Sequence, residues 1–188
     1  FESDSVTKLL VDHFDSDGSC TEKSLAYYLY GCALSDIGKA PEALQAFYDA
    51  IDRADTTRTD CGYNVLKGIY GQMSRIFHKQ NLPQDEIWAL KHYIDCVRRT
   101  SNEVDFIIAN GQMIRPYYLL NEKDSVLFII NNAYQSLKRL GKYREAAEVL
   151  VTSIYIYMER GQMSEAKKNM DIYEHESGLF DKDGNIST

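Results

Sequence analysis

The side chains that could carry catalysis or hold a metal are spread singly along the chain. The four histidines, His13, His78, His92 and His175, are scattered and show no H-E-x-x-H spacing of the kind that binds zinc on a helix. The sequence also lacks the phosphate-binding glycine loops and the G-x-S-x-G element that carries a serine nucleophile. We therefore predict a protein that is not an enzyme and that holds no metal and no cofactor.

Two short acidic stretches resemble calcium loops. They run from Asp15 to Ser19 and from Asp181 to Asn185. A calcium loop with Gly18 in its sixth position needs an acidic residue at its first position and a glutamate at its twelfth, where the sequence has His13 and Ser24. For the second stretch the required positions fall beyond Thr188. Both stretches are predicted to be turns.

The four cysteines are Cys20, Cys32, Cys61 and Cys96, separated by 12, 29 and 35 residues. These spacings contain no C-x-x-C pair and no compact disulfide framework, so we predict free or buried thiols. The cysteines leave the redox compartment open.

Charge and hydropathy narrow the class of partner. The chain has 21 basic and 28 acidic side chains and a net charge of -7, with its basic residues dispersed. Nucleic acid and anionic membranes are therefore poor partners. The longest apolar run, Val126 to Ile130, is far shorter than the roughly 20 residues that span a bilayer, so we predict no membrane contact by this segment. Because it begins with Phe1 and ends in a polar stretch, the sequence looks like an excised piece.

The elements that position these residues follow from an internal repeat. Turn-like segments begin at Gly38, Asn81, Asn121 and Gly161, at spacings of 43, 40 and 40 residues, and another begins at Gly141. Apolar and aromatic residues recur at helical spacing on both sides of each of the four turns, so each unit is predicted to be a helical hairpin. The expected helices span residues 3–14, 21–37, 41–54, 62–79, 83–99, 103–119, 123–139, 143–160 and 163–177. The apolar run at 126–130 is expected to be buried on both sides.

The first unit resembles the tetratricopeptide repeat (TPR) family. The matching residues are Tyr27, Tyr30, Gly31, Leu34, Gly38, Ala43, Phe47 and Ala50. The resemblance implies an all-α fold, a right-handed α-solenoid of about four TPR-like helical hairpins with a leading helix. It places an N-terminal helix and turn at 1–20, the repeat domain at 21–178 and a polar tail at 179–188. It also implies that Ala43 is nearly buried. The repeat period is longer than the usual length of about 34 residues.

In such repeats a concave groove lined by the first helix of each hairpin binds a partner segment. The register points eight candidate binding residues into this groove: Tyr28, Ser35, Arg75, His78, Arg115, Tyr118, Tyr155 and Met158. Arg75 and Arg115 occupy the same position in successive units, and guanidinium groups bind carboxylates in bidentate fashion. An acidic peptide is therefore the expected partner. The alternative is that both arginines pair with local acids such as Asp36 or Glu159.

The resulting hypothesis is a non-catalytic TPR-like scaffold for protein or peptide binding. The alternative is a ligand- or peptide-sensing module of a larger signalling or transcription-regulatory protein. Within the TPR family, the sequences of residues 69–73, 76–83 and 117–125 are most similar to those of cell-envelope proteins of Bacteroidetes. That similarity implies a location in the bacterial cell envelope or periplasm, the alternative being the cytoplasm.

Overall fold

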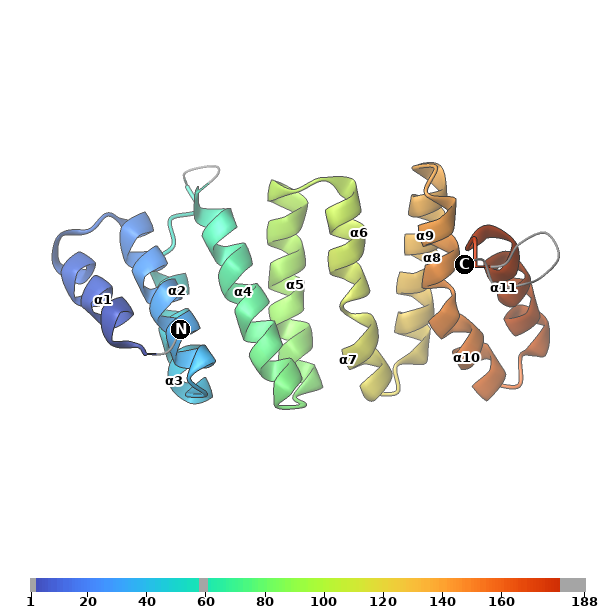
Figure 1. Cartoon of the computed structure of the whole chain (residues 1–188), viewed down its shortest axis with the longest axis horizontal. Coiled ribbons are helices and arrows are strands. Elements are labelled where there is room, and N and C mark those ends of the chain that lie inside the picture. The colour runs from blue at the N-terminus through green and yellow to red at the C-terminus, as the bar shows by residue number, and fades with distance from the viewer. Residues whose placement is uncertain (1–2, 58–60, 180–188) are drawn as a thin grey trace. The chain divides into compact units, whose positions relative to one another are not determined.

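A computed structural model describes residues 3–57 and 61–179 of the chain, and every regular element in these ranges is a helix (Figure 1). The predicted all-α class is confirmed. The chain divides into two compact units, Phe1–Ala109 and Asn110–Thr188, each described by itself. Most of the predicted tail at 179–188, and the acidic stretch from Asp181 to Asn185, lie outside the described residues.

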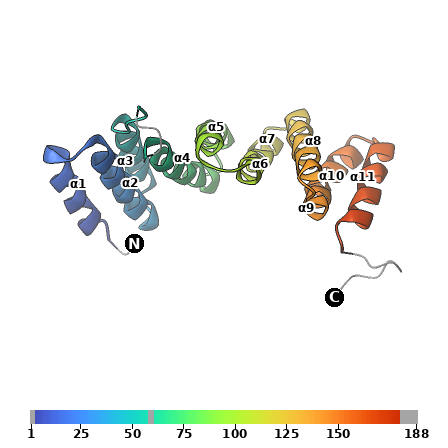
Figure 2. The same ribbon diagram turned by 90° about the horizontal axis from the view of Figure 1, so that it is seen from above.

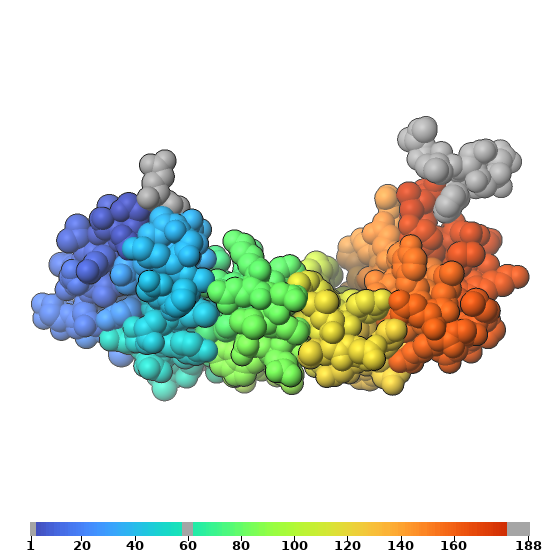
Figure 3. All heavy atoms as spheres, turned by 90° about the horizontal axis from the view of Figure 1, so that it is seen from below, coloured from blue at the N-terminus to red at the C-terminus, as the bar shows by residue number. Residues whose placement is uncertain are grey.

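The N-terminal unit is built from helical hairpins. The helices are α1 (Ser5–Asp17), α2 (Cys20–Asp36), α3 (Ala40–Asp52), α4 (Cys61–Lys79) and α5 (Pro83–Thr100), and α6 (Glu103–Gly111) crosses the boundary between the units. Helix α2 pairs with α3, and α4 pairs with α5, while α1 lies beside α2 (Figure 2). Helix α4 also packs against α2 and α3, so the two hairpins share one core. In the space-filling view, side chains fill the spaces between these helices (Figure 3).

The C-terminal unit continues the helical pattern. It contains α7 (Ile114–Leu119), α8 (Lys123–Arg139), α9 (Tyr143–Val149), α10 (Val151–Glu159) and α11 (Met163–Glu176). Helix α8 packs against α7, α9 and α10, and α11 packs against α9 and α10. The core of this unit is formed by Val126 and Ile130 of α8 together with Leu150 and Ile156.

Two predicted helices are interrupted, so those predictions were wrong in detail. The segment 103–119 divides into α6 and α7 because Pro116 has no backbone N–H and its ring disfavours a helical carbonyl at Gln112. The segment 143–160 divides into α9 and α10 at Leu150. At both breaks a backbone N–H bonds three residues back, from Met113 to Asn110 and from Leu150 to Ala147, which is a tighter turn than the α-helix makes.

All five predicted turns have the same backbone geometry. Their first residues, Gly38, Asn81, Asn121, Gly141 and Gly161, have φ between 55° and 83°. In each turn this residue donates its N–H to the carbonyl three residues earlier, and the next residue donates to the carbonyl five residues earlier. This is the Schellman arrangement, in which a residue with positive φ ends a helix and satisfies its last carbonyls. Glycine and asparagine are favoured there because other side chains resist this conformation.

The Gly141 turn provides a test of this preference. Gly141 has φ 73°, and a Cβ added to it would have no atom within 4 Å. We expect Gly141→Ala to destabilise the C-terminal unit by about 1–2 kcal/mol through backbone strain alone. The matched control is Gly111→Ala, which also opens into empty space but has no positive φ. Equal urea-unfolding curves for the two variants would contradict the backbone account.

A close approach within the first hairpin involves Gly31 and Phe47. Phe47 is fully buried, and a Cβ at Gly31 would lie 2.5 Å from its Cε1 atom. Ala43, one turn before Phe47 on α3, is 0% exposed, which confirms the burial expected for it. A residue without a side chain on α2 therefore lets the ring of Phe47 fill the space between the two helices.

Two local predictions were wrong. Asp15 to Asp17 continue α1 instead of forming a turn, and Ser19 caps the next helix through a reciprocal pair of hydrogen bonds with Glu22. The apolar run at 126–130 is not buried on all sides, because Phe128 is 69% exposed. A helix turns successive residues through different directions, and Phe128 lies on the side of α8 away from the core residues Val126 and Ile130.

Candidate binding surfaces

The first candidate surface lies on α2 and α4 of the N-terminal unit, and we call it the α2–α4 surface. It comprises Tyr28, Cys32 and Ser35 of α2 with Gln72 and Arg75 of α4. Tyr28 crosses to α4, since its ring would lie 3.1 Å from a Cβ placed on Gly68. Partial burial raises the pKa of the Tyr28 hydroxyl, which also interacts with Cys32, Gln72 and Arg75. The structure thus brings together Tyr28 and Arg75, two of the predicted binding residues.

Arg75 is exposed on this surface. Within residues 3–57 and 61–179, no carboxylate oxygen lies within 4.0 Å of its guanidinium nitrogens, so no ion pair neutralises it. Two other predicted binding residues of this unit, Ser35 and His78, form contacts within the chain. Ser35 is half-buried at the end of α2, where its carbonyl accepts the N–H of Gly38. His78 lies 2.9 Å through Nδ1 from Oε1 of Glu86, a residue that is only 4% exposed.

The second candidate surface lies on α7 and α10 of the C-terminal unit. The Tyr118 hydroxyl donates to Oε1 of Glu159 at 2.9 Å, and Lys123 Nζ lies 2.6 Å from Oε2. The hydrogen bond from Lys123, followed by that from Tyr118, lowers the pKa of Glu159. Both carboxylate oxygens of Glu159 are therefore already bonded.

The other predicted residues of the C-terminal unit differ in exposure. Tyr155 is 63% exposed and Met158 is 50% exposed on α10, while Arg115 of α7 is half-buried. Arg75 and Arg115 belong to different units, and the expectation that they line one wall stays a prediction.

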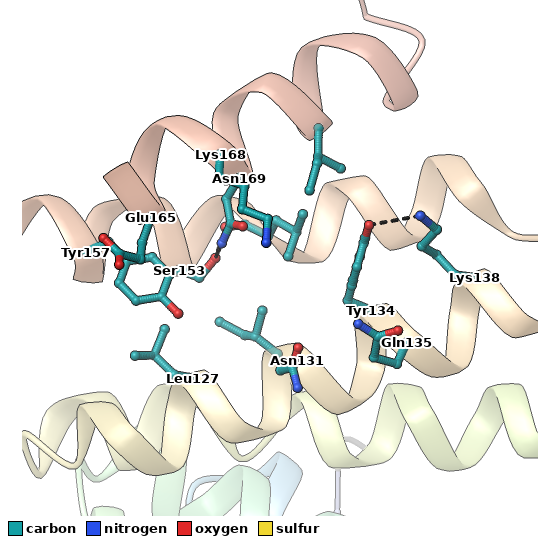
Figure 4. A pocket seen from close by; sticks show the side chains of 13 residues that line it. Leu127, Asn131, Tyr134, Gln135, Lys138, Ser153, Tyr157, Glu165, Lys168 and Asn169 are labelled. Carbon is teal, nitrogen blue, oxygen red and sulfur yellow. Dashed lines mark hydrogen bonds between the residues drawn. The ribbon is translucent and has the colours of Figure 1, made fainter. Parts of the chain in front are cut away.

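A pocket of about 400 Å³ lies between three helices of the C-terminal unit, and we call it the α8–α11 pocket (Figure 4). One wall is formed by α8 through Leu127, Ile130, Asn131, Tyr134, Gln135 and Lys138. The facing wall is formed by α11 through Glu165, Lys168, Asn169 and Ile172. The floor is formed by Leu150, with Ser153 and Tyr157 of α10.

Polar groups of the α8–α11 pocket form two internal hydrogen bonds. Asn169 Nδ2 donates to the hydroxyl of Ser153 at 2.8 Å, and Lys138 Nζ donates to the hydroxyl of Tyr134 at 3.1 Å, as the dashed lines in Figure 4 mark. Ser153 is 1% exposed, so the first bond fixes the floor of the pocket to α11. Both pairs orient side chains that line the cavity.

Sequence reasoning did not find this pocket. A signal was present, because Asn131, Gln135 and Lys138 are spaced by four and three residues and therefore share one face of α8. Ser153 was a second signal, since a small polar side chain stands in the fourth unit where the first unit has the large ring of Tyr30.

An aromatic cluster on the N-terminal unit contains none of the predicted binding residues. The rings of Tyr48 and Trp88 are 6.1 Å apart, those of Tyr70 and Trp88 are 5.8 Å apart, and His92 stacks on Tyr70 at 4.7 Å. Tyr48 is 43% exposed and Trp88 is 38% exposed. These rings mainly join α3, α4 and α5, and their exposed edges form a rival contact surface.

The thiols whose surroundings are described are free. Cys20 is exposed, Cys32 is half-buried and Cys96 is buried, in agreement with the prediction of free or buried thiols. The side chain of Cys61 lies outside the described residues. Burial raises the pKa of Cys96 to about 11 from its ordinary value of 9.0.

Alkylation should separate these thiols. Because the thiolate is the reactive form, we expect iodoacetamide at about pH 8 to label Cys20 rapidly and Cys96 only after unfolding. The rise in pKa alone lowers the thiolate fraction of Cys96 roughly a hundredfold. Mass spectrometry of the peptides that contain each cysteine provides the measurement. Labelling of Cys96 at the rate of Cys20 in the folded chain would contradict its burial on α5.

In residues 3–57 and 61–179, no group of three or more His, Cys, Asp or Glu side chains is arranged to hold a metal ion. Over the same residues, none of the helices has both the length and the apolar character needed to cross a bilayer.

Comparison with solved structures relates this chain to BtubC. BtubC (BKLC) from P. vanneervenii superimposes with a TM-score of 0.61 at 11% sequence identity, over 97% of this chain and 72% of that chain. At this identity the likeness establishes a shared all-helical fold and nothing about activity. No family model matches the sequence, and no curated protein matches it either.

Proposed function

We propose that this chain is a non-catalytic TPR-like scaffold that binds a polypeptide partner. In this proposal its hairpins form a right-handed α-solenoid of about four units with a leading helix. The five equivalent turns at Gly38, Asn81, Asn121, Gly141 and Gly161 support a repeating design. The Gly31–Phe47 contact and the buried Ala43 support the TPR assignment of the first hairpin, because they occupy the positions that carry the resemblance.

The observation that carries the proposed activity is the Tyr28–Arg75 pair on the α2–α4 surface. Arg75 is an exposed guanidinium that no carboxylate of the described chain neutralises, beside a tyrosine held in place by α4. Tyrosine and arginine are enriched among residues that dominate binding energies, and arginine binds carboxylates through two parallel hydrogen bonds. An acidic peptide segment is therefore the proposed partner. We also propose a location in the bacterial cell envelope, which rests only on the sequence similarity of residues 69–73, 76–83 and 117–125 to envelope proteins.

The experiment that tests this function is a selection of end-blocked random octapeptides on the immobilised whole chain. Sequencing of the bound pool should show enrichment of aspartate and glutamate over the input library. A pool that matches the material retained by blank resin would contradict polypeptide binding. Enrichment of lysine and arginine would contradict the acidic partner but keep the scaffold function.

A sensing function is the second candidate, and the α8–α11 pocket favours it. Its volume of about 400 Å³ falls in the range of small-molecule sites, which run from roughly 300 to 1,000 Å³. In this role a ligand bound in the pocket would report to a partner domain. Thermal stabilisation by a free small molecule, with no octapeptide enriched, would favour sensing over scaffolding.

A further inference from the structure

We propose that the α8–α11 pocket is a second binding site, which takes an extended peptide segment with an acidic side chain. This inference rests on the proposed polypeptide-binding function and adds a site outside the predicted binding residues. The site lies wholly within the C-terminal unit, so it needs no contribution from the other unit.

The shape of the pocket suits an extended chain. Helices α8 and α11 lie on opposite sides of the pocket and run in roughly the same direction in Figure 4, with Leu127 and Glu165 toward one end and Lys138 toward the other. The lining residues of α11 extend from Glu165 to Ile172, which is about 10 Å along a helix axis. Three residues of an extended peptide also span about 10 Å. A chain laid between the two helices therefore fits the walls along its length.

The chemistry of one wall suits a peptide backbone. Asn131 and Gln135 expose their carboxamides on α8, one helical turn apart. Each carboxamide both donates and accepts hydrogen bonds, as a peptide group does. Four residues along a helix rise about 6 Å, close to the roughly 6.6 Å between alternate residues of an extended chain. Asn131 and Gln135 can thus bond backbone groups two residues apart that face the same wall.

The charge on the other wall selects an acidic side chain. Lys168 is exposed and projects with Asn169 from α11 into the pocket (Figure 4). Among the residues that the structure describes, no carboxylate oxygen lies within 4.0 Å of the Lys168 ammonium. The pKa of Glu165 is lowered chiefly by the hydrogen bond from Ser164, and the charge of Lys168 adds a smaller effect. A partner carboxylate would provide the missing counter-charge. Glu165 and the two lysines give the lining little net charge, which suits a peptide better than a polyanion such as nucleic acid.

The neighbouring residues in the sequence provide matched controls. Asn132 follows Asn131 on α8, and Lys167 precedes Lys168 on α11; both are exposed and neither lines the pocket. The test measures affinities of the octapeptides enriched on the whole chain for Asn131→Ala, Lys168→Gln and their controls Asn132→Ala and Lys167→Gln. We expect Asn131→Ala and Lys168→Gln each to weaken binding of some enriched acidic octapeptides by about three- to tenfold. The two controls should retain the affinity of the unaltered chain.

The outcomes separate this inference from the proposed function. If enriched octapeptides lose affinity with Arg75→Ala but with neither pocket variant, the pocket proposal is overturned and peptide binding stands. Equal loss with Lys167→Gln and Lys168→Gln would also overturn it, since it would indicate general charge attraction. If N-acetylglutamate amide binds as tightly as the octapeptides, the pocket is a small-molecule site and not a peptide site. If no octapeptide is enriched at all, the proposed function and this inference fail together.

Discussion

Phe47→Ala is expected to destabilise the N-terminal unit by about 3–5 kcal/mol, the usual cost of removing a large buried aromatic ring. Phe47 is 0% exposed and fills the space that Gly31 leaves between α2 and α3. Total stabilities of domains are typically about 5–15 kcal/mol, so this loss is a large fraction of the whole. Urea unfolding followed by fluorescence of Trp88 measures it, because the only tryptophan lies on α5 of the same unit.

The control for this prediction is Phe128→Ala. Phe128 is 69% exposed on α8, so its removal takes little apolar surface out of the core. We expect a change within about 0.5 kcal/mol in unfolding followed by circular dichroism. Similar losses for the two variants would show that Phe47 is not the centre of the first hairpin.

Arg75→Ala combined with Arg115→Ala is expected to weaken binding of an enriched acidic peptide by about 1–4 kcal/mol. The reason is the loss of two guanidinium groups that are proposed to bind its carboxylates. Because Arg75 is exposed and forms no ion pair in the described chain, its removal should leave the melting temperature nearly unchanged. Titration calorimetry measures the affinity, and differential scanning calorimetry measures the stability.

Single variants separate the contributions of Arg75 and Arg115 to binding and to stability. Arg115 is half-buried, so Arg115→Ala can also disturb packing, whereas Arg75→Ala tests binding alone. Arg144→Ala is the charge-matched control, because Arg144 is exposed and pairs with Glu148 one turn along α9. Equal losses of affinity for Arg75→Ala and Arg144→Ala would show that the loss comes from the change in net charge and not from a specific contact of Arg75. Parallel losses of stability and binding would mark the arginines as structural.

The turns were predictable from the sequence because their chemistry is local. A residue with positive φ must be glycine or a residue such as asparagine, so Gly38, Asn81, Asn121, Gly141 and Gly161 could be read directly from residue type and spacing. The burial of Ala43 was predictable for a related reason, since a repeated hairpin brings the same position to the closest approach of two helices. The break at Leu150 was not predictable in this way, because no proline or glycine marks it.

The candidate sites were less accessible to sequence reasoning because they depend on contacts between distant segments. The proximity of Tyr28 and Arg75 followed from the repeat register, which places each of them on the first helix of its own hairpin, α2 and α4. The hydrogen bond between Ser153 and Asn169 did not, because it depends on how α11 folds back on α10. The pairing of His78 with Glu86 was also missed, since a groove register does not show that the imidazole meets a buried carboxylate across the α4–α5 turn.

Hydrogen exchange of the whole chain, with and without an enriched acidic octapeptide, tests polypeptide binding most directly. The account predicts slower exchange in the parts of α2 and α4 that carry Tyr28 and Arg75, and this protection should persist in Lys168→Gln, whose pocket is impaired. Unchanged exchange at both helices would contradict the account. Protection confined to α3 and α5, around Tyr48 and Trp88, would contradict it as well, because binding would then lie on the rival aromatic cluster.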